Sequence, residues 1–234
     1  MTQPGTEDPS MELPLVAPLQ RERPATTSES PQPKPVLLSK VEPIPPTDSL
    51  RILDFDLETL AAGYADPAWV PDKITCISAS WIGEDEVFTW TTGQRGYWSR
   101  RERARRVLRP FYKLLSQADV VTGHNVERFD LRVFNAEAMR CNVEPVRQIL
   151  VEDTMRVLRS KGFKKGLDNI AVELDVAGRK KAMSWAEWDR AYEDPTWGEV
   201  IERCETDVRL HKMVREEMRR RGWLKTYQPR MWRA

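Results

Sequence analysis

Hydrophobic and polar residues alternate one by one in the segment ILDFDLETL (52–60). Leu53, Phe55 and Leu57 occupy one side of this alternation, and three carboxylates occupy the other. Because successive side chains of a β-strand point to opposite faces, the pattern predicts a strand with one apolar face and one acidic face.

Two further segments have the β-branched and aromatic composition of strands. They are DKITCISASWI (72–82) and EVFTW (86–90), and the turn residues 83–85 separate them. Together with the first strand they predict a three-stranded antiparallel meander.

A helical period follows the meander. Ser99 precedes Glu102 by three residues, the spacing of a capping box, and apolar residues then recur at helical intervals as far as Leu115. Pro110 lies inside this pattern and is predicted to kink or split the helix, because proline has no backbone N–H to donate.

Strands and helices alternate in the next part of the chain. Phe129, Val133 and Ala136 are the expected apolar face of the first helix there. The predicted elements are a strand in ADVVTGHN (118–125), a helix in VERFDLRVFNAEAMR (126–140), a strand in QILVEDT (148–154) and a helix at 167–174.

Two capping-box spacings mark the last two predicted helices. Ser184 pairs with Glu187, Thr196 pairs with Glu199, and Gly222 is placed to end the second helix. The order of elements predicts an α/β fold, a mixed sheet of an antiparallel meander plus parallel strands, flanked by helices.

The composition changes near residue 50 of the 234-residue chain. The first 50 residues hold 11 of the 17 prolines and no aromatic residue, a composition that cannot bury enough apolar surface to order itself. We expect a disordered proline-rich tail at 1–49 and one folded domain at 50–234. The tail is a candidate docking element for a replication or repair partner.

Several classes of protein are excluded by composition. No apolar run approaches the roughly 20 residues that a bilayer requires, and the N-terminus lacks the pattern of a secretory signal. We therefore expect a cytoplasmic protein without a membrane segment. The cysteines Cys76, Cys141 and Cys204 have no C-x-x-C spacing and are expected to be small buried residues.

Carboxylates in three separate segments form the candidate chemistry. Asp56 and Glu58 share the acidic face of the first strand, Asp130 lies at the start of a helix, and Asp207 lies beside the apolar stripe of the last helix. Each has an ordinary structural interpretation: a solvated edge strand, an acid at a helix N-terminus, and an ion pair with Arg203. Together they are four hard oxygen donors of the kind that Mg²⁺ or Mn²⁺ prefers.

The sequences FDLET, GHNVERFD and CETD resemble, in order, the three exonuclease motifs of the DEDD superfamily of 3′–5′ exonucleases. That superfamily has a ribonuclease-H-like fold and includes the proofreading domains of DNA polymerases. The resemblance spans about 52–210. It implies a two-metal-ion enzyme that removes nucleotides from the 3′ end of single-stranded nucleic acid, with DNA expected over RNA.

By this resemblance Asp56, Glu58, Asp130 and Asp207 are catalytic residues that hold two Mg²⁺ or Mn²⁺ ions. The resemblance also implies a set of substrate contacts. They are Leu57 and Thr59 in the first motif and Asn125 and Phe129 in the second.

One departure from the family concerns the third motif. Members carry Tyr four residues before the final Asp or His five before it, where this chain has Arg203 and Glu202. An active enzyme that uses metals alone, an enzyme assisted by His211, and a weakened nuclease all remain open. The alternative function is therefore a catalytically weak or inactive nucleic-acid-binding protein of the same fold.

Basic residues are candidates for contacts with substrate phosphates. Arg203 is one, although an ion pair with Glu199 or Asp207 is an equal alternative. Lys165 belongs to a basic group at 161–165, and a second group lies at 178–181.

Overall fold

The computed structural model describes residues 50–60, 73–92, 99–159, 162–180, 183–194, 196–224 and 230–234. These residues belong to one unit that spans Ile44–Ala234. The predicted tail at 1–49 lies outside the described residues. Among the residues that are described, no helix combines the length and the apolar character needed to cross a membrane.

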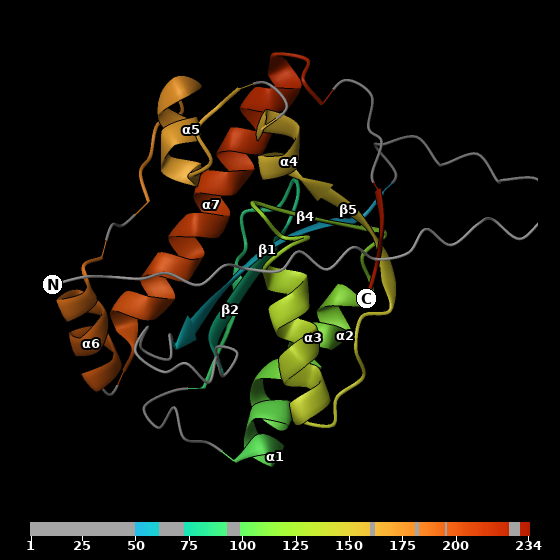
Figure 1. The fold of residues 1–234 in the computed structure, drawn as a ribbon, viewed down its shortest axis with the longest axis vertical. Coiled ribbons are helices and arrows are strands. Elements are labelled where there is room, and N and C mark those ends of the chain that lie inside the picture. Colours follow the sequence, from blue (N-terminus) through green and yellow to red (C-terminus); the bar gives the residue numbers. More distant parts are fainter. Residues whose placement is uncertain are drawn as a thin grey trace, which may run out of the picture. The chain divides into compact units, whose positions relative to one another are not determined.

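Six strands form one mixed sheet in the order β3-β2-β1-β4-β5-β6 (Figure 1). The first three strands pair antiparallel, which confirms the predicted meander, and β4 and β5 then run parallel to β1. The sixth strand pairs antiparallel with β5 and was not predicted. The bounds are β1 Ile52–Leu60, β2 Lys73–Trp81, β3 Phe88–Thr91, β4 Val120–Gly123, β5 Gln148–Asp153 and β6 Arg230–Arg233.

Helices flank this sheet, as the sequence pattern predicted. Pro110 lies in the first turn of α2, directly after a π-helical stretch that lies between α1 and α2, and the backbone is helical throughout 100–115. The bounds are α1 Arg100–Arg103, η2 Ala104–Leu108, α2 Arg109–Leu115, α3 Asp130–Arg140, α4 Thr154–Arg159, α5 Leu167–Glu173, α6 Trp185–Glu193 and α7 Gly198–Arg220.

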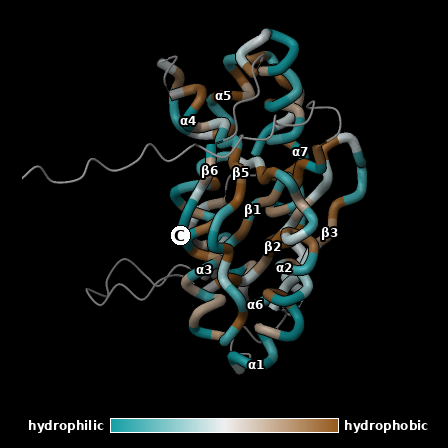
Figure 2. Tube along the Cα trace, turned by 90° about the vertical axis from the view of Figure 1, so that its right-hand side faces the viewer, coloured by the Kyte–Doolittle hydropathy of each residue, from teal (hydrophilic) through white to brown (hydrophobic). Residues whose placement is uncertain are grey.

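The central strand β1 is covered on both faces. Its apolar residues belong to a core shared with α2 and α3, where the rings of Phe55 and Phe111 are 5.0 Å apart. Its acidic face lies against α7, where His211 contacts Asp54. The interpretation of this segment as a solvated edge strand is therefore wrong, because β1 has β2 on one side and β4 on the other. Hydrophobic segments run through the strands in Figure 2, and hydrophilic ones predominate on the surrounding turns.

The apolar face predicted for α3 is rotated by about one residue. Leu131, Phe134 and Ala138 are buried, whereas Phe129 is 37% exposed. The reason lies in the preceding turn, because Asn125 adopts a left-handed φ of 72° and the helix begins only at Asp130.

Capping at the last two helices follows the prediction at one helix only. The capping box of Ser184 and Glu187 is present at α6. At α7 the N-cap is Trp197, with φ of 53°, and Thr196 instead accepts a hydrogen bond from the Gly198 N–H. Gly222, with φ of 77°, follows the end of α7 as predicted.

Candidate metal centre

Three predicted ligands meet where β1 faces α7. One carboxylate oxygen from each of Asp56, Glu58 and Asp207 lies within 4.8 Å of the other two. Among the described residues, the buried Oδ1 atom of Asp207 has no hydrogen-bond partner. A buried carboxylate oxygen without a partner is costly, so this donor set fits a divalent cation of the Mg²⁺ or Mn²⁺ type.

Local structure explains how these side chains converge. The period of two in β1 places Asp56 and Glu58 on the same face, and the register shifts just after Glu58. On α7, the buried Cys204 donates its thiol to the Asp56 carbonyl oxygen at 3.4 Å, so the helix approaches the strand closely there. Asp207 follows Cys204 by about one helical turn and therefore projects beside the same carboxylates.

Asp130 is buried at the first position of α3, next to this cluster. Its Oδ1 accepts a hydrogen bond of 3.2 Å from the Leu57 N–H, which ties α3 to β1. It is not one of the three residues whose oxygens lie within 4.8 Å. Its role as a fourth ligand therefore stays a prediction.

Burial dominates the electrostatics of the acids. It raises the pKa of Asp130 to about 7. Burial also raises the pKa of Asp56 well above its ordinary range, and the charges of Asp130 and Glu58 raise it further. These groups disfavour their own ionised forms when no cation is present, and a bound divalent cation would reverse that preference.

Two basic side chains neutralise part of the cluster. Arg203 Nε lies 2.9 Å from Glu58 Oε1, a partner that the sequence did not predict. The Lys180 ammonium contacts Asp207 Oδ2. Burial lowers the pKa of Lys180, but the charges of Asp207 and Asp56 outweigh that effect and raise it.

The sequence pattern indicated Lys180 only as a member of the basic group at 178–181 and gave no connection to the carboxylates. No local pattern could have done so, because the lysine follows α5 in an irregular segment. Its position is fixed in part by its own backbone, whose N–H donates to Asp168 Oδ1.

The predicted substrate contacts are distributed around the cluster. Leu57 is only 3% exposed, so its backbone is the part nearest to Asp130. Phe129 is exposed, Asn125 and Thr59 are half-buried, and Lys165 is exposed. The roles of these four residues and of Leu57 as substrate contacts stay predictions.

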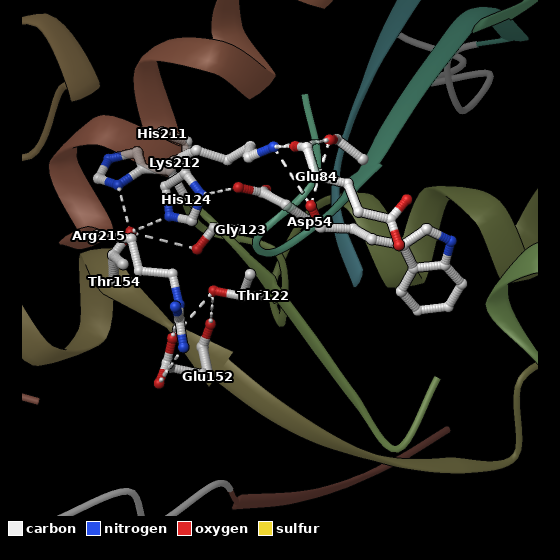
Figure 3. Close-up of polar contacts among 12 residues, drawn as sticks. Asp54, Glu84, Thr122, Gly123, His124, Glu152, Thr154, His211, Lys212 and Arg215 are labelled. Atoms are coloured by element: carbon white, nitrogen blue, oxygen red, sulfur yellow. Dashed lines mark hydrogen bonds and ion pairs between the residues drawn. The ribbon is translucent and has the colours of Figure 1, made fainter. Parts of the chain in front are cut away.

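A buried polar network lies further along α7 (Figure 3). His211 Nδ1 is 2.7 Å from Asp54 Oδ2, and its Nε2 is 2.8 Å from Thr154 Oγ1. Thr154 Oγ1 is also 3.1 Å from His124 Nδ1. Burial lowers the pKa of His124 to about 4, so this ring is neutral and its Nε2 donates to the Lys165 carbonyl oxygen.

This network gives His211 a structural task. Both of its ring nitrogens are engaged within hydrogen-bond distance of Asp54 and Thr154, so the ring joins α7 to β1 and to the start of α4. Arg215 supplies a second connection from α7, through an ion pair of 2.5 Å with Glu152 of β5. The contacts hold α7 in the position that brings Asp207 to the strand.

Comparison with known proteins agrees with this arrangement. The model of the RNase H superfamily matches residues 55–219. No curated protein matches the chain. A solved structure, the family B DNA polymerase from the hyperthermophilic archaeon Pyrobaculum calidifontis, is similar with a TM-score of 0.59 and 20% identity over 72% of this chain. The match spans 24% of the polymerase chain, so the likeness concerns one part of that protein.

Proposed function

Because the chain belongs to the RNase H superfamily, we propose that it is a two-metal-ion 3′–5′ exonuclease acting on single-stranded DNA. The superfamily and the acidic cluster support a nuclease-type function that depends on divalent metal and acts on nucleic acid. The finer proposal is that the enzyme degrades the strand from its 3′ end and prefers DNA. It rests on the order of the three motifs. The family B DNA polymerase that shares the fold is consistent with a DNA substrate.

The observation that carries the proposal is the convergence of Asp56, Glu58 and Asp207 from two distant segments. These three carboxylates, with Asp130, would hold two Mg²⁺ or Mn²⁺ ions. Bound ions of this kind activate a water on one side of a phosphodiester and stabilise the leaving oxygen on the other.

Side chains of the protein would position the substrate around that centre. Lys180 contributes a positive charge beside Asp207 and is placed to attract a phosphate. Phe129, exposed directly before Asp130, would offer its aromatic ring for stacking on the terminal base. Because Arg203 is paired with Glu58, its guanidinium would neutralise this carboxylate rather than orient a water.

A cleavage assay tests the proposal. A 5′-labelled single-stranded DNA oligonucleotide is incubated with Mg²⁺ or Mn²⁺, with EDTA, and with the Asp56→Ala protein. A ladder that shortens from the 3′ end, present only with metal and the unchanged protein, is the expected result. Products that are internal fragments would reject the exonuclease assignment while leaving a nuclease.

A second candidate function is a nucleic-acid-binding protein with little or no catalysis. The ion pair between Arg203 and Glu58 favours it, because a metal ion must compete with the guanidinium for this carboxylate. Intact oligonucleotide with retained binding would support this candidate. The Arg203→Tyr protein would then be tested for restored cleavage.

A further inference from the structure

Five arginines line a pocket on the other side of the second motif. The pocket has a volume of about 480 Å³ and is bounded by the turn before α3, the start of α4 and the strand β6. Its basic residues are Arg128, Arg132, Arg156, Arg230 and Arg233. In Figure 1 the α3 helix is seen between α7 and the C-terminal end of the chain, where β6 lies.

The pocket has an uncompensated positive charge. Its acids are Asp153 and Glu127. The Asp153 carboxylate already accepts hydrogen bonds from the backbone N–H groups of Asn125, Glu127 and Arg156. Glu127 Oε1 lies 3.3 Å from Arg156 Nε and so compensates that one arginine.

The other four arginines are available to a ligand. Within the described part of the chain, no carboxylate lies at ion-pair distance from Arg128, Arg132, Arg230 or Arg233, and all four are exposed. Arg128 and Arg132 are four residues apart at the start of α3, a spacing that places side chains next to each other on a helix. Guanidinium groups bind phosphate oxygens in pairs, and several in one hollow attract anions strongly.

A nucleic-acid strand is the anion that this position fits. One turn, residues 124–129, connects the pocket with the metal centre, because Asn125 and Arg128 line the pocket and Asp130 lies beside the carboxylates. A single ligand can reach both places only if it carries more than one linked phosphate, as a nucleic-acid strand does.

We propose that the arginine pocket binds the phosphate backbone of the substrate strand, on the 5′ side of the end held at the metal centre. The inference rests on the proposed function for its substrate, but its binding contribution does not depend on catalysis. The pocket lengthens the binding site and anchors the strand during removal of its terminal nucleotides.

Anisotropy with a fluorescein-labelled dT12 oligonucleotide tests the inference. The full-length Asp56→Ala protein is used in EDTA so that no cleavage occurs, and NaCl is varied. Arg128→Gln with Arg132→Gln should weaken dT12 binding about tenfold. Loss of two contacts should also reduce the slope of log K against log salt by about 1.4, at about 0.7 for each phosphate contact. The matched control, Arg209→Gln with Arg219→Gln on α7, should bind within twofold of the parent protein.

A second pair of substitutions guards against a folding defect. Arg230→Gln with Arg233→Gln alters the other wall of the pocket and should weaken binding in the same way, with circular dichroism confirming the fold of both proteins. Inorganic phosphate and unlabelled dT12 are compared as competitors of labelled dT12 at equal concentrations of phosphate groups. Equal competition by inorganic phosphate would identify a site for a free anion and overturn the proposal.

Failure of the inference and failure of the proposed function are distinguishable. Unchanged dT12 binding in both arginine pairs, with 3′ shortening retained in the otherwise unchanged protein, rejects the pocket alone. Weakened dT12 binding in the arginine variants, without any metal-dependent cleavage by the protein that retains Asp56, supports the pocket and rejects the exonuclease.

Discussion

The Arg203 guanidinium is paired with the Glu58 carboxylate at 2.9 Å, and the two side chains are only 12% and 14% exposed. The arginine is further held above the ring of Trp188, at 5.1 Å from its centroid. The guanidinium of Arg203 is therefore already paired with Glu58, one of the predicted metal ligands. This pair and the contact of Lys180 with Asp207 determine what a metal ion must displace.

Removing the charge at position 203 should strengthen metal binding. We expect Arg203→Gln to bind Mn²⁺ about tenfold more tightly, a change of about 1.4 kcal/mol, because Glu58 is released from its ion pair. Titration calorimetry on the full-length protein measures the affinity. Equal affinity in both proteins would mean that Glu58 does not contribute to the metal site.

Lys180 should affect both metal binding and cleavage, in opposite directions. Lys180→Met removes the ammonium that contacts Asp207, so Mn²⁺ affinity should rise severalfold. The cleavage rate at saturating metal should fall about tenfold, because a charge near the reacting phosphate is lost. Lys113→Met, at an exposed position on α2, is the control and should change neither quantity.

The metal-free protein should lose stability as the pH rises from about 4 to about 7. Burial raises the pKa of Asp130 to about 7 from an ordinary value of 3.8, so the unfolded chain releases this proton first. The protonated Asp130 therefore adds to the free energy of unfolding when the pH is below its ordinary pKa. This contribution disappears as the pH rises through the pKa that Asp130 has in the folded state.

Urea unfolding in EDTA at several pH values measures this effect. Asp130→Asn should make the free energy of unfolding depend less on pH between about 4 and about 7, because an amide does not titrate. A slope that is unchanged in Asp130→Asn would assign the effect to the other buried acids. Added Mn²⁺ should restore stability most at the higher pH, where the ligands ionise at the lowest cost.

Loss of His211 should destabilise the fold without acting on the chemistry directly. His211→Leu leaves the buried Asp54 carboxylate without its partner, which should reduce the free energy of unfolding by about 3 kcal/mol. The double variant Asp54→Leu with His211→Leu should recover much of that loss. A His211→Leu protein of normal stability but greatly reduced cleavage would instead identify the histidine as part of the reaction.

Asp56 should be essential for metal binding and dispensable for folding. Asp56→Asn removes a carboxyl group whose pKa is raised by burial and by the charges of Asp130 and Glu58. Because the ionised form of this group is unfavourable in the metal-free protein, the melting temperature in EDTA should stay the same or rise. The upward shift of that temperature with Mn²⁺ should disappear. If Mn²⁺ still raised the melting temperature of the Asp56→Asn protein, the metal would bind to other residues.

Local patterns predicted much of the fold. The alternation in 52–60 identified β1 and its acidic face, and the turn at 83–85 identified the meander. The apolar face of α3 was displaced by a residue, because the left-handed Asn125 rotates the helix relative to the simple period. Strand β6 has too short and too basic a sequence to be distinguished from a surface loop.

The sequence by itself determined which acids are candidates, because the period of a strand or helix and the order of motifs are properties of consecutive residues. Tertiary structure alone decided which cations face those acids and where the arginines gather. Lys180, Arg203 and the carboxylates are separated by long stretches of chain, and their contacts depend on how α7 packs on β1. The pocket at β6 likewise exists only because the end of the chain pairs with β5, a long-range choice that no local period encodes.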